Sequence, residues 1–597
     1  EEAQVPGPPA AAAAAAGRGG ALRPALFLIA AAALGQVDDP ILRALGDEVA
    51  RAKSLKLAGL ESPYYVAASI EDLDSFTATA TLGALVRASR TLVRVPQMQV
   101  RVGDYDFDNT NYVGSGFFSG SRYDLERLPL DNSYPLLRRH LWLASDQAYK
   151  GAVESIARKR AALRNVTVAE KIADFARAEP VRLIEPSRRS AVDEDGWKDR
   201  LRRLSAVLGK YPDLRTSGVE LEIVQNTHYQ ATSEGTQVRV PEALLVVRAR
   251  AWSQAPDGMM LRDAVAFHFP DITRVASDAE MGRALEALAG NVTTLAKAPI
   301  GEIYNGPAIF EGEASPQLFA QVLGRNLSLF RRPVTEPNRS LPFPASELEG
   351  RAGSRILPEW MDVVCDPTQK EWRGRPLLGH YRVDLEGTAP TPLSLVEKGV
   401  LKQFLLTRQP VRGFSGSNGR ARLLGAFGAY GASFANLFVT ARETVPGAEL
   451  KKKLLEMISA RGKAYGLILR KLDFPTSGSL DDLRRQFAGS QQQGGAGRVV
   501  SSPVLAYKVF PDGREELVRG LRFRSLGVRA LRDIQAASDQ PFVFEYLDSG
   551  APLAMAGSGG LVAETAVIAP AVLIDDVELD RIEEDFPKIP IVPPPQP

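Results

Sequence analysis

The sequence is poor in the side chains that build most thiol and metal sites. Its 597 residues include one cysteine, Cys365, and four histidines, His140, His228, His268 and His380. A single cysteine excludes a disulfide within the chain and a cysteine-rich zinc site. The histidines are scattered and form no His-x-x-x-His or His-Glu-x-x-His pair. We interpret Cys365 as a small buried side chain, which is the commoner role of a lone cysteine.

The chain also lacks an excess of charge of either sign. Lys+Arg 73 against Asp+Glu 71 gives a formal net charge of +2, so no global field favours nucleic acid or an anionic membrane. The basic segments 157–164 and 451–471 carry apolar residues at helical spacing, and we interpret both as solvated helix faces. A hydrophobic content of 45% is ordinary for a soluble globular protein, and the length predicts several domains.

Several enzyme signatures are missing as well. The sequence contains no Gly-x-Ser-x-Gly elbow, no Walker loop and no Cys-x-x-Cys pair. The serine hydrolase, NTPase and dithiol classes therefore have no support.

A sustained apolar run occurs only near the N-terminus. The sequence begins with Glu1 rather than Met, which suggests a fragment or an over-extended reading. Pro and Ala at 8–17 predict a disordered lead. Arg23, an apolar core at 24–34 and small residues before Gln36 have the layout of a secretory signal peptide, and the core is too short to span a bilayer as a mature helix. We predict export to the periplasm or the cell exterior, with a buried or amphipathic helix in a cytoplasmic protein as the alternative.

The N-terminal half alternates helical and strand-like patterns. Pro96 interrupts an alternating run and predicts an edge strand or a bulge. The expected elements, in order, are a helix at 40–60, strand hairpins at 63–109, a helix at 134–164, a linker around 180–197, a strand-rich block at 219–269 and a helix at 278–298.

The C-terminal half mixes short strands with isolated helices. A turn at Asn305-Gly306-Pro307 precedes an apolar strand, which leads into a helix start at 310–321. The later elements are expected to be three short strands at 377–410 with a turn at 397–399, a flexible basic loop at 415–422, a helix at 449–462, a Gln/Gly-rich loop at 487–498, a helix at 528–537 and a closing strand at 571–582.

These patterns predict an α+β fold. It comprises an N-terminal helix-and-hairpin domain, a β-rich middle domain and a large mixed β-rich C-terminal domain. The boundaries are a disordered lead and signal peptide at 1–36, the N-terminal domain at 37–150, the middle domain at 151–300, the C-terminal domain at 301–585 and a Pro-rich extended tail at 586–597.

His380 is the one histidine followed closely by carboxylates, Asp384 and Glu386. A metal site built from these three would need an unbroken strand to place them on one face. We favour a structural role for these three residues over a metal site. We also favour a structural role for His268, which lies in an alternating strand.

Three motifs in the C-terminal half, taken in order, resemble the TldD/PmbA family of metallopeptidase-related proteins. They are Gly306 to Glu313, Asp384 to Arg408, and Ser417-Asn418-Gly419-x-x-Arg422. The segments "KLLEMISARGKAYGL" and "APAVLIDDVELDR" follow in the expected order, and the Ser-Glu-Gly-Thr turn at 233–236 is similar to one in the family's middle domain. The resemblance covers about residues 40–585, is strongest from residue 300 onward, and rests on many weak motifs in order.

The resemblance implies where a metal would be bound. Catalytic members carry His-Glu-x-x-x-His at the strand-to-helix junction and a later cysteine, which hold zinc, while the glutamate takes a proton from metal-bound water. In this sequence the glutamate falls on Glu313. The histidine positions fall on Gly312 and Gln317, and the cysteine position falls near Pro503. None of these three supplies a nitrogen or sulfur ligand of the usual kind, so no metal and no other cofactor is predicted.

Glu313 therefore has two interpretations. It is the candidate catalytic residue by position, but without a metal a carboxylate complementing the helix dipole explains it better, and the same applies to Glu311. By resemblance, Ser417, Asn418 and Arg422 are candidates for lining a substrate chamber. A solvent-exposed loop explains them equally.

The resemblance implies three alternatives for function. The first is a metal-free, TldE/PmbA-like subunit that pairs with a TldD-like catalytic partner in peptide processing and is inactive alone. The second is an active metallopeptidase with relocated or partner-supplied ligands. The third is a non-enzymatic homodimeric binding or scaffold protein. Peptide is the expected substrate, with no nucleic-acid partner and no stable membrane span in the mature chain.

Overall fold

The computed structural model describes residues 39–113, 121–123, 128–164, 171–187, 189–335, 345–424, 429–474, 500–548, 563–583 and 586. The chain divides into residues 1–39 and 40–597, and every helix and strand below belongs to the second unit. The predicted signal peptide, the loop at 487–498 and all of the tail except Phe586 lie outside the described residues. Within the described part, no helix is long and apolar enough to cross a membrane.

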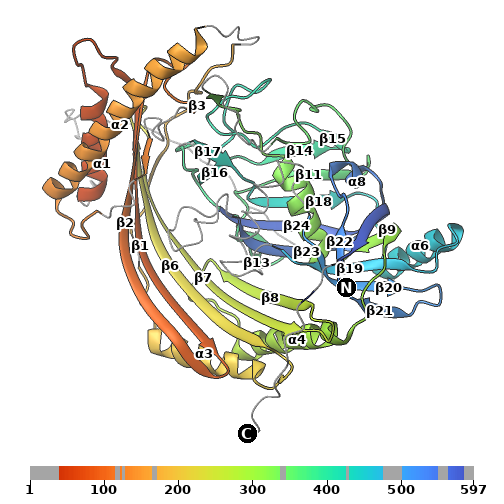
Figure 1. The fold of residues 1–597 in the computed structure, drawn as a ribbon. Coiled ribbons are helices and arrows are strands. Elements are labelled where there is room, and N and C mark those ends of the chain that lie inside the picture. Colours follow the sequence, from red (N-terminus) through yellow and green to blue (C-terminus); the bar gives the residue numbers. More distant parts are fainter. Residues whose placement is uncertain are drawn as a thin grey trace, which may run out of the picture. The chain divides into compact units, whose positions relative to one another are not determined.

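The first large sheet has seven strands among the described residues, in the order β4-β2-β1-β6-β7-β5 with β8 beside β7. Four of these strands are long and curve together in Figure 1. They come from both the predicted N-terminal and the predicted middle domain. The strands are β1 (Pro63–Thr81), β2 (Ala84–Val102), β4 (Ser121–Tyr123), β5 (Arg182–Ile184), β6 (Thr216–Thr232), β7 (Gln237–Gln254) and β8 (Met260–Phe269).

Four helices cover one face of this sheet. They are α1 (Pro40–Lys53), α2 (Tyr134–Leu163), α3 (Glu194–Leu208) and α4 (Asp278–Lys297). The helices α1 and α2 pack at one end against Ile70 and Tyr229, and α3 and α4 pack at the other end against Ala78 and Leu221. Since alternate residues of a strand share a face, the even positions of β1 and the odd positions of β6 face the helices.

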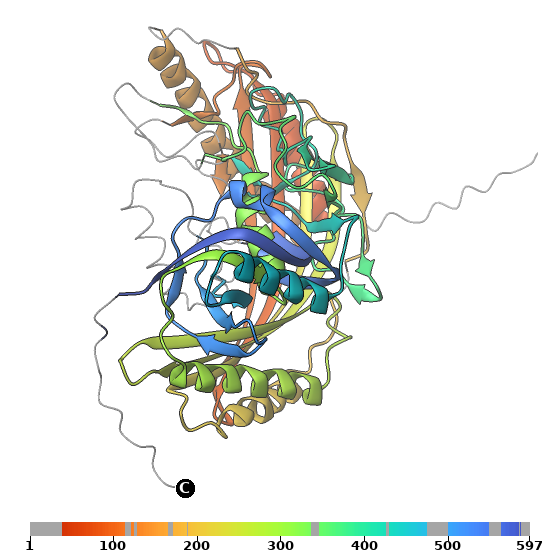
Figure 2. The same cartoon turned by 90° about the vertical axis from the view of Figure 1, so that its right-hand side faces the viewer.

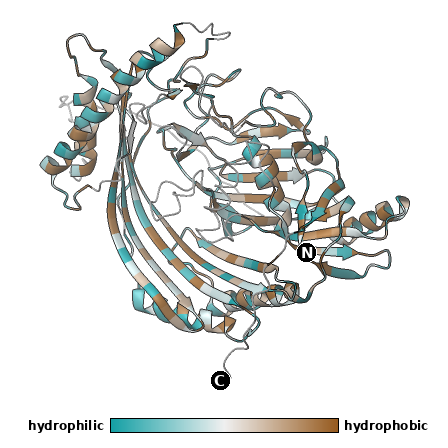
Figure 3. Cartoon of the chain, viewed as in Figure 1, coloured by the Kyte–Doolittle hydropathy of each residue, from teal (hydrophilic) through white to brown (hydrophobic). Residues whose placement is uncertain are grey.

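The opposite face of the sheet is polar, and Figure 3 shows the resulting alternation along the long strands. It carries the even positions of β6 and β7, including Asn226, His228 and Glu242. Gln230 Nε2 on this face donates to Leu385 O at 2.9 Å, so the polar face is turned toward the C-terminal half.

The second large sheet has eleven strands among the described residues, in the order β15-β14-β11-β18-β24-β9-β19-β20-β21, with β22 and β23 beside β24. Its bounds are β9 (Tyr304–Phe310), β11 (Met361–Cys365), β14 (Leu393–Glu397), β15 (Val400–Leu401), β18 (Asn436–Ala441), β19 (Gly466–Leu472), β20 (Pro503–Val509), β21 (Glu515–Val518), β22 (Leu521–Phe523), β23 (Ile534–Asp548) and β24 (Ala563–Arg581). The strand β9, which leads to the candidate site, lies buried between β24 and β19.

Short helices and strands complete the C-terminal half. The helix α6 packs on β9, β19 and β24 through Leu454 and Ile458, and Figure 2 shows it crossing these strands. The remaining elements are β3 (Tyr112–Val113), α5 (Ala314–Leu318), a π-helix (Phe319–Leu323), a 3-10 helix (Gly324–Asn326), β10 (Val334–Thr335), β12 (Glu371–Trp372), β13 (Arg375–Pro376), β16 (Ala421–Leu424), β17 (Tyr430–Ala432), α6 (Gly447–Ala460) and α8 (Val528–Arg532).

The α+β prediction is confirmed, with local corrections. Pro96 lies opposite Ile70 without a register shift, so it marks no bulge. The strand β2 that carries it lies between β4 and β1, so it is not the edge strand that Pro96 predicts. The predicted linker at 180–197 contains β5 and the start of α3. The three strands expected at 377–410 are two, β14 and β15, around the predicted turn. The helix expected at 528–537 ends at Arg532, where β23 soon begins.

Candidate functional site

The strand-to-helix junction is formed by β9, Gly312 and α5. Gly312 has φ +59, a left-handed conformation that glycine adopts at little cost. A Cβ at this position would meet Arg470 O at 3.1 Å. The backbone therefore suits glycine and disfavours a histidine, which is the residue that the family motif places here.

Gln317, at the second histidine position, is part of the scaffold. It is 1% exposed, and its Oε1 accepts a hydrogen bond of 2.8 Å from Leu472 N. Leu472 in turn pairs with Pro503 at the start of β20. The structure thus brings the three ligand positions of the motif to one place, but each is occupied by a residue with a structural role.

Glu313 stands at the start of α5, where a carboxylate complements the helix dipole, and it makes no side-chain capping bond. Its carboxylate lies 3.5 Å from Nζ of Lys471 on β19. Glu311 forms a separate pair with Arg470, at 2.7 Å from Oε1 to Nε. Both acidic residues of the junction are therefore matched by cations from the neighbouring strand.

Lys471 is the central cation of the junction. Its ammonium lies 2.8 Å from Oδ1 of Asp263 and donates to Ala264 O at 2.7 Å. Burial acts to lower the pKa of Lys471, but the carboxylates of Asp263 and Glu313 outweigh it and hold the pKa above its ordinary value. The ammonium is thus charged at every physiological pH.

These residues do not fit a zinc ion. Zinc requires several nitrogen, sulfur or carboxylate ligands in an open arrangement. Here Gly312 supplies no side chain, Gln317 is committed to Leu472, and a permanent positive charge stands beside Glu313. Among the described residues, no group of three or more His, Cys, Asp or Glu side chains is placed to hold a metal ion.

A cavity of about 760 Å³ opens at this junction. Glu313, Gln317 and Lys471 lie on its wall. The remaining wall comes mainly from β8, the α4 N-terminus and β23, and combines aromatic with charged side chains, among them Phe267, Phe269, Phe474, Phe544, Arg248, Arg375, Glu545 and His268. Its size falls within the range of small-molecule and peptide pockets.

His268, expected to be structural, lines this cavity. Burial, together with the charges of Arg248 and Arg375, lowers the pKa of His268 to about 3. The imidazole is therefore neutral at physiological pH and adds no charge to the cavity wall.

His380, Asp384 and Glu386 are not brought together as a metal site. They lie outside any strand. His380 Nδ1 contacts Pro367 O at 2.8 Å, while Asp384 accepts from the backbone of Thr388 and Ala421. Burial and the charge of Glu386 raise the pKa of Asp384 to about 7. These carboxylates hold loops in place, which is the structural role favoured from the sequence.

Ser417, Asn418 and Arg422 lie in a tightly bonded loop. Asn418 Oδ1 accepts from Leu406 N at 2.9 Å, and Ser417 Oγ donates to Leu406 O at 3.4 Å. Arg422 Nη1 donates to Glu564 O at 2.7 Å. The neighbouring Arg420 is fully buried, so the loop is anchored rather than freely solvated. A substrate role for these residues stays a prediction.

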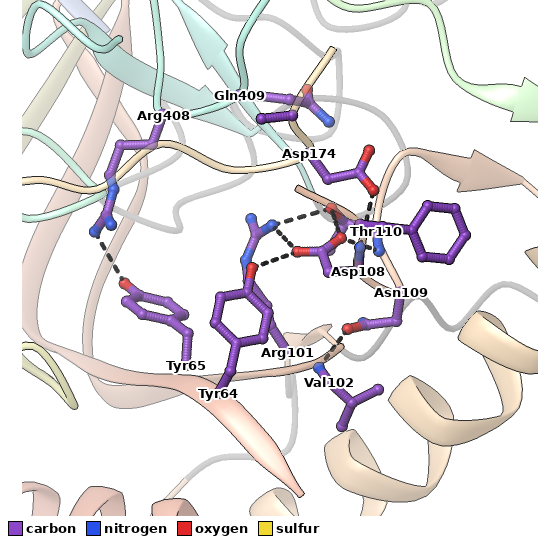
Figure 4. A network of polar contacts seen from close by, with 12 residues as sticks. Tyr64, Tyr65, Arg101, Val102, Asp108, Asn109, Thr110, Asp174, Arg408 and Gln409 are labelled. Carbon is purple, nitrogen blue, oxygen red and sulfur yellow. Dashed lines mark hydrogen bonds and ion pairs between the residues drawn. The ribbon is translucent and has the colours of Figure 1, made fainter. Parts of the chain in front are cut away.

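A buried charge network, which sequence reasoning missed, joins the two halves of the chain. Figure 4 shows Arg101 between Asp108 and Thr110, and Arg408 reaching Tyr65. Arg408 also pairs with Glu234, at 2.8 Å. These residues come from segments far apart in the sequence, and no local sequence pattern predicts that they contact each other.

The comparisons with known proteins agree with the sequence motifs. Residues 304–472 match the profile of the PmbA/TldA metallopeptidase C-terminal domain. No curated protein matches the sequence.

Three solved structures share the fold. One is a candidate modulator of a DNA gyrase from Thermotoga maritima, with 14% identity, coverage of 86% of this chain and 96% of that chain, and a TM-score of 0.53. TldE from Thermococcus kodakarensis has 14% identity, coverage of 87% and 97%, and a TM-score of 0.51. A candidate modulator of DNA gyrase from Bacteroides thetaiotaomicron has 10% identity, coverage of 91% and 98%, and a TM-score of 0.55.

At these identities the likeness of the solved structures concerns the fold, while the profile match concerns the C-terminal domain itself. The predicted resemblance to the TldD/PmbA family is confirmed for residues 304–472, which match the PmbA/TldA metallopeptidase C-terminal domain, and the chain shares its fold with these three solved structures.

Proposed function

We propose that this chain is a metal-free, TldE/PmbA-like subunit that takes part in peptide processing with a catalytic, TldD-like partner. The observation that carries the proposal is the ammonium of Lys471 beside Glu313, at the junction where catalytic members are expected to bind zinc. In the metal-dependent mechanism, the glutamate takes a proton from a water whose pKa a bound metal has lowered. Here it has a lysine instead.

The cavity at the junction supports peptide as the ligand class. Its 760 Å³ is lined by aromatic rings and by charges of both signs. Apolar walls with a few fixed polar groups are typical of sites that hold mixed ligands such as short peptide segments. The chain would contribute binding surface, and the partner would contribute the reactive groups.

The pairing is tested by coexpression with a sister protein from the same genome that carries an intact His-Glu-x-x-x-His motif. We expect the two chains to copurify in fixed stoichiometry and to cleave unfolded peptides together, whereas this chain alone cleaves none. Chelator-sensitive cleavage by this chain alone would instead support relocated metal ligands. A stable homodimer that ignores the sister protein would support a scaffold, and either result would overturn the proposal.

We also propose that the chain is exported, on the basis of Arg23 and the apolar core at 24–34. Expression of the full sequence, followed by cell fractionation and N-terminal sequencing, tests this. A mature chain beginning near residue 37 in the exported fraction supports export, and an uncleaved cytoplasmic chain contradicts it.

A further inference from the structure

A second group of charged side chains lies on the polar face of the first sheet. It is centred on Glu242 of β7, away from the cavity residue Arg248 on the same strand. Glu242 on β7 stands directly opposite Asn226 on β6. His228, two positions along β6, stands opposite Glu71 on β1. Cross-strand partners and alternate residues of a strand share a face, so these four side chains lie together.

Glu564, on β24 of the second sheet, belongs to the same group. Burial and the charge of Glu242 raise the pKa of Glu564 to about 8. Glu242 is itself open to solvent, although the protein surrounds it closely enough for burial to raise the pKa of its carboxyl group. That combination is expected of a side chain facing water inside a hollow of the protein.

Among the described residues, none donates a hydrogen bond to either carboxyl group. Burial and neighbouring charges act on Glu242 and Glu564, and no hydrogen bond to either contributes within the described residues. Arg422 is the cation that acts on both, but its Nη1 donates to main-chain oxygens, at 3.0 Å to Phe434 O and 2.7 Å to Glu564 O. Both carboxylates therefore remain available to a ligand.

The charges of the group do not balance. Glu71 lies 2.6 Å from Nδ1 of His228. Burial acts to lower the pKa of His228, but Glu71 outweighs it and raises the pKa to about 9, so this pair is neutral as a whole at pH 7. Arg422 offsets one of the two remaining carboxylates. One negative charge is left over when both are ionised, and one monovalent cation would balance it.

Asn226 adds an independent sign of a ligand. It is 8% exposed, and its Nδ2 donates to Glu71 Oε2 at 2.6 Å. Its Oδ1 is buried and has no hydrogen-bond donor in the described part of the chain. Buried acceptors are nearly always paired, because an unmet one costs free energy. An N–H donor placed beside Glu242 would satisfy it.

We propose that Glu242, Glu564 and the Oδ1 of Asn226 bind the protonated basic side chain, lysine or arginine, of a peptide held against the polar face of the first sheet. The proposal rests on the proposed peptide function and names its substrate class. An ammonium or guanidinium supplies the missing charge and the missing N–H donors together. A metal ion is disfavoured, because no described group of three or more His, Cys, Asp or Glu is placed to hold one.

Two peptides test the site directly. Ac-Ala-Ala-Lys-Ala-Ala-amide and its norleucine counterpart differ only in the ammonium, and each is titrated into the purified chain by calorimetry at pH 7. We expect the lysine peptide to bind about tenfold more tightly. It should also release protons, seen as different heats in phosphate and Tris buffers, because the cation replaces the proton held by Glu564.

Three variants separate the site from general electrostatics. E242Q and E564Q should each abolish the preference for lysine. E222Q, which changes a carboxyl group on the same face of β6 whose pKa is also raised by burial, should keep it. Thermal unfolding confirms that each variant is folded.

The outcomes distinguish this proposal from the function on which it rests. Equal binding of the two peptides, or a preference that survives both E242Q and E564Q, overturns the cation site and leaves peptide binding intact. Failure of both peptides to bind overturns the cation site and contradicts the proposed function as well. Saturable binding of Zn²⁺ that is lost in E242Q would replace the organic cation by a metal and also overturn the proposal.

Discussion

Lys471 brings a permanent positive charge to the junction where the family's catalytic members are expected to hold a metal ion. It comes from β19 and contacts Asp263 of β8 and Glu313 before α5. The ammonium occupies the space beside both carboxylates and repels a metal ion placed next to Glu313. The chemistry of the junction therefore depends on the side chain of Lys471, which belongs to none of the sequence motifs.

Replacing Lys471 by Met should destabilise the protein by about 3–5 kcal/mol, because it leaves the carboxylate of Asp263 buried and unpaired. Urea unfolding measures the change. Lys508→Met is the matched control on the next strand, since Lys508 pairs with the exposed Glu302 and should contribute less than about 1 kcal/mol. Equal losses of stability in the two variants would show that the buried contact of Lys471 stabilises the protein no more than the exposed pair of Lys508.

The pair of His228 and Glu71 makes stability depend on pH. The pKa of His228 is about 9 in the folded chain against an ordinary value of 6.5. A raised pKa gives stabilisation that is complete below about pH 6.5 and is lost as the pH rises through 9. The Glu71→Gln variant should therefore lose up to about 3 kcal/mol at pH 6 relative to the native chain, and much less at pH 9.5. A difference that does not change with pH would contradict the ion pair.

At the scale of elements, the junction between β9 and α5 is set by backbone conformation. Gly312 turns the chain with a positive φ and approaches Arg470 O. The helix that follows has only five residues and continues as a π-helix. Gln317 N still donates to Glu313 O at 3.1 Å, so positions 313 and 317 lie one helical turn apart. The departure from the motif is confined to position 312 and the side chain at 317. The local backbone thus suits the glycine that stands at position 312.

Gly312→Ala should cost about 1–2 kcal/mol, since alanine in the left-handed region is strained. Gly416→Ala is the matched control, because a Cβ at Gly416 meets nothing within 4 Å and its φ lies outside the left-handed region. Thermal unfolding of both variants provides the measurement. A control variant that loses as much stability as Gly312→Ala would refute the conformational reason.

The long elements could be predicted from the sequence because their periodicity extends over many residues. The helix at 134–164 and the strands at 219–269 agree closely with α2 and β6 to β8. The helix predicted at 528–537 is too long. Helix-forming residues continue past Arg532, but there the chain pairs with β24, and this pairing overrides the local helix propensity. The junction could be found through its family motif, whereas Lys471 and the group around Glu242 could not, since sheet pairing brings them together from distant segments.

At the scale of the whole described unit, buried charges fasten the first sheet to the C-terminal half. Arg408 follows β15 and is 1% exposed in its side chain. It bonds to Ala176 O and to Glu234 near the β6–β7 turn. Glu386 accepts from its backbone N–H at 2.6 Å. Such contacts fix how the polar face of the first sheet meets the loops of the second half.

Arg408→Met should therefore destabilise the chain by about 3–5 kcal/mol, because Glu234 and a main-chain oxygen lose their partner in a buried place. Denaturant unfolding followed by tryptophan fluorescence measures the loss. Arg524→Met, at an exposed pair with Asp580, is the control and should change stability far less, because solvent screens an exposed ion pair. An unchanged midpoint for Arg408→Met would show that the network does not hold the halves together.

The most direct measurement is the zinc content of the purified chain after incubation with excess Zn²⁺ and extensive dialysis, determined by elemental mass spectrometry. Because Gly312 and Gln317 replace the histidines and Lys471 supplies the cation, we expect far less than one zinc per chain. One zinc per chain that survives dialysis, and is lost when Glu313 is replaced by Gln, would contradict a metal-free junction.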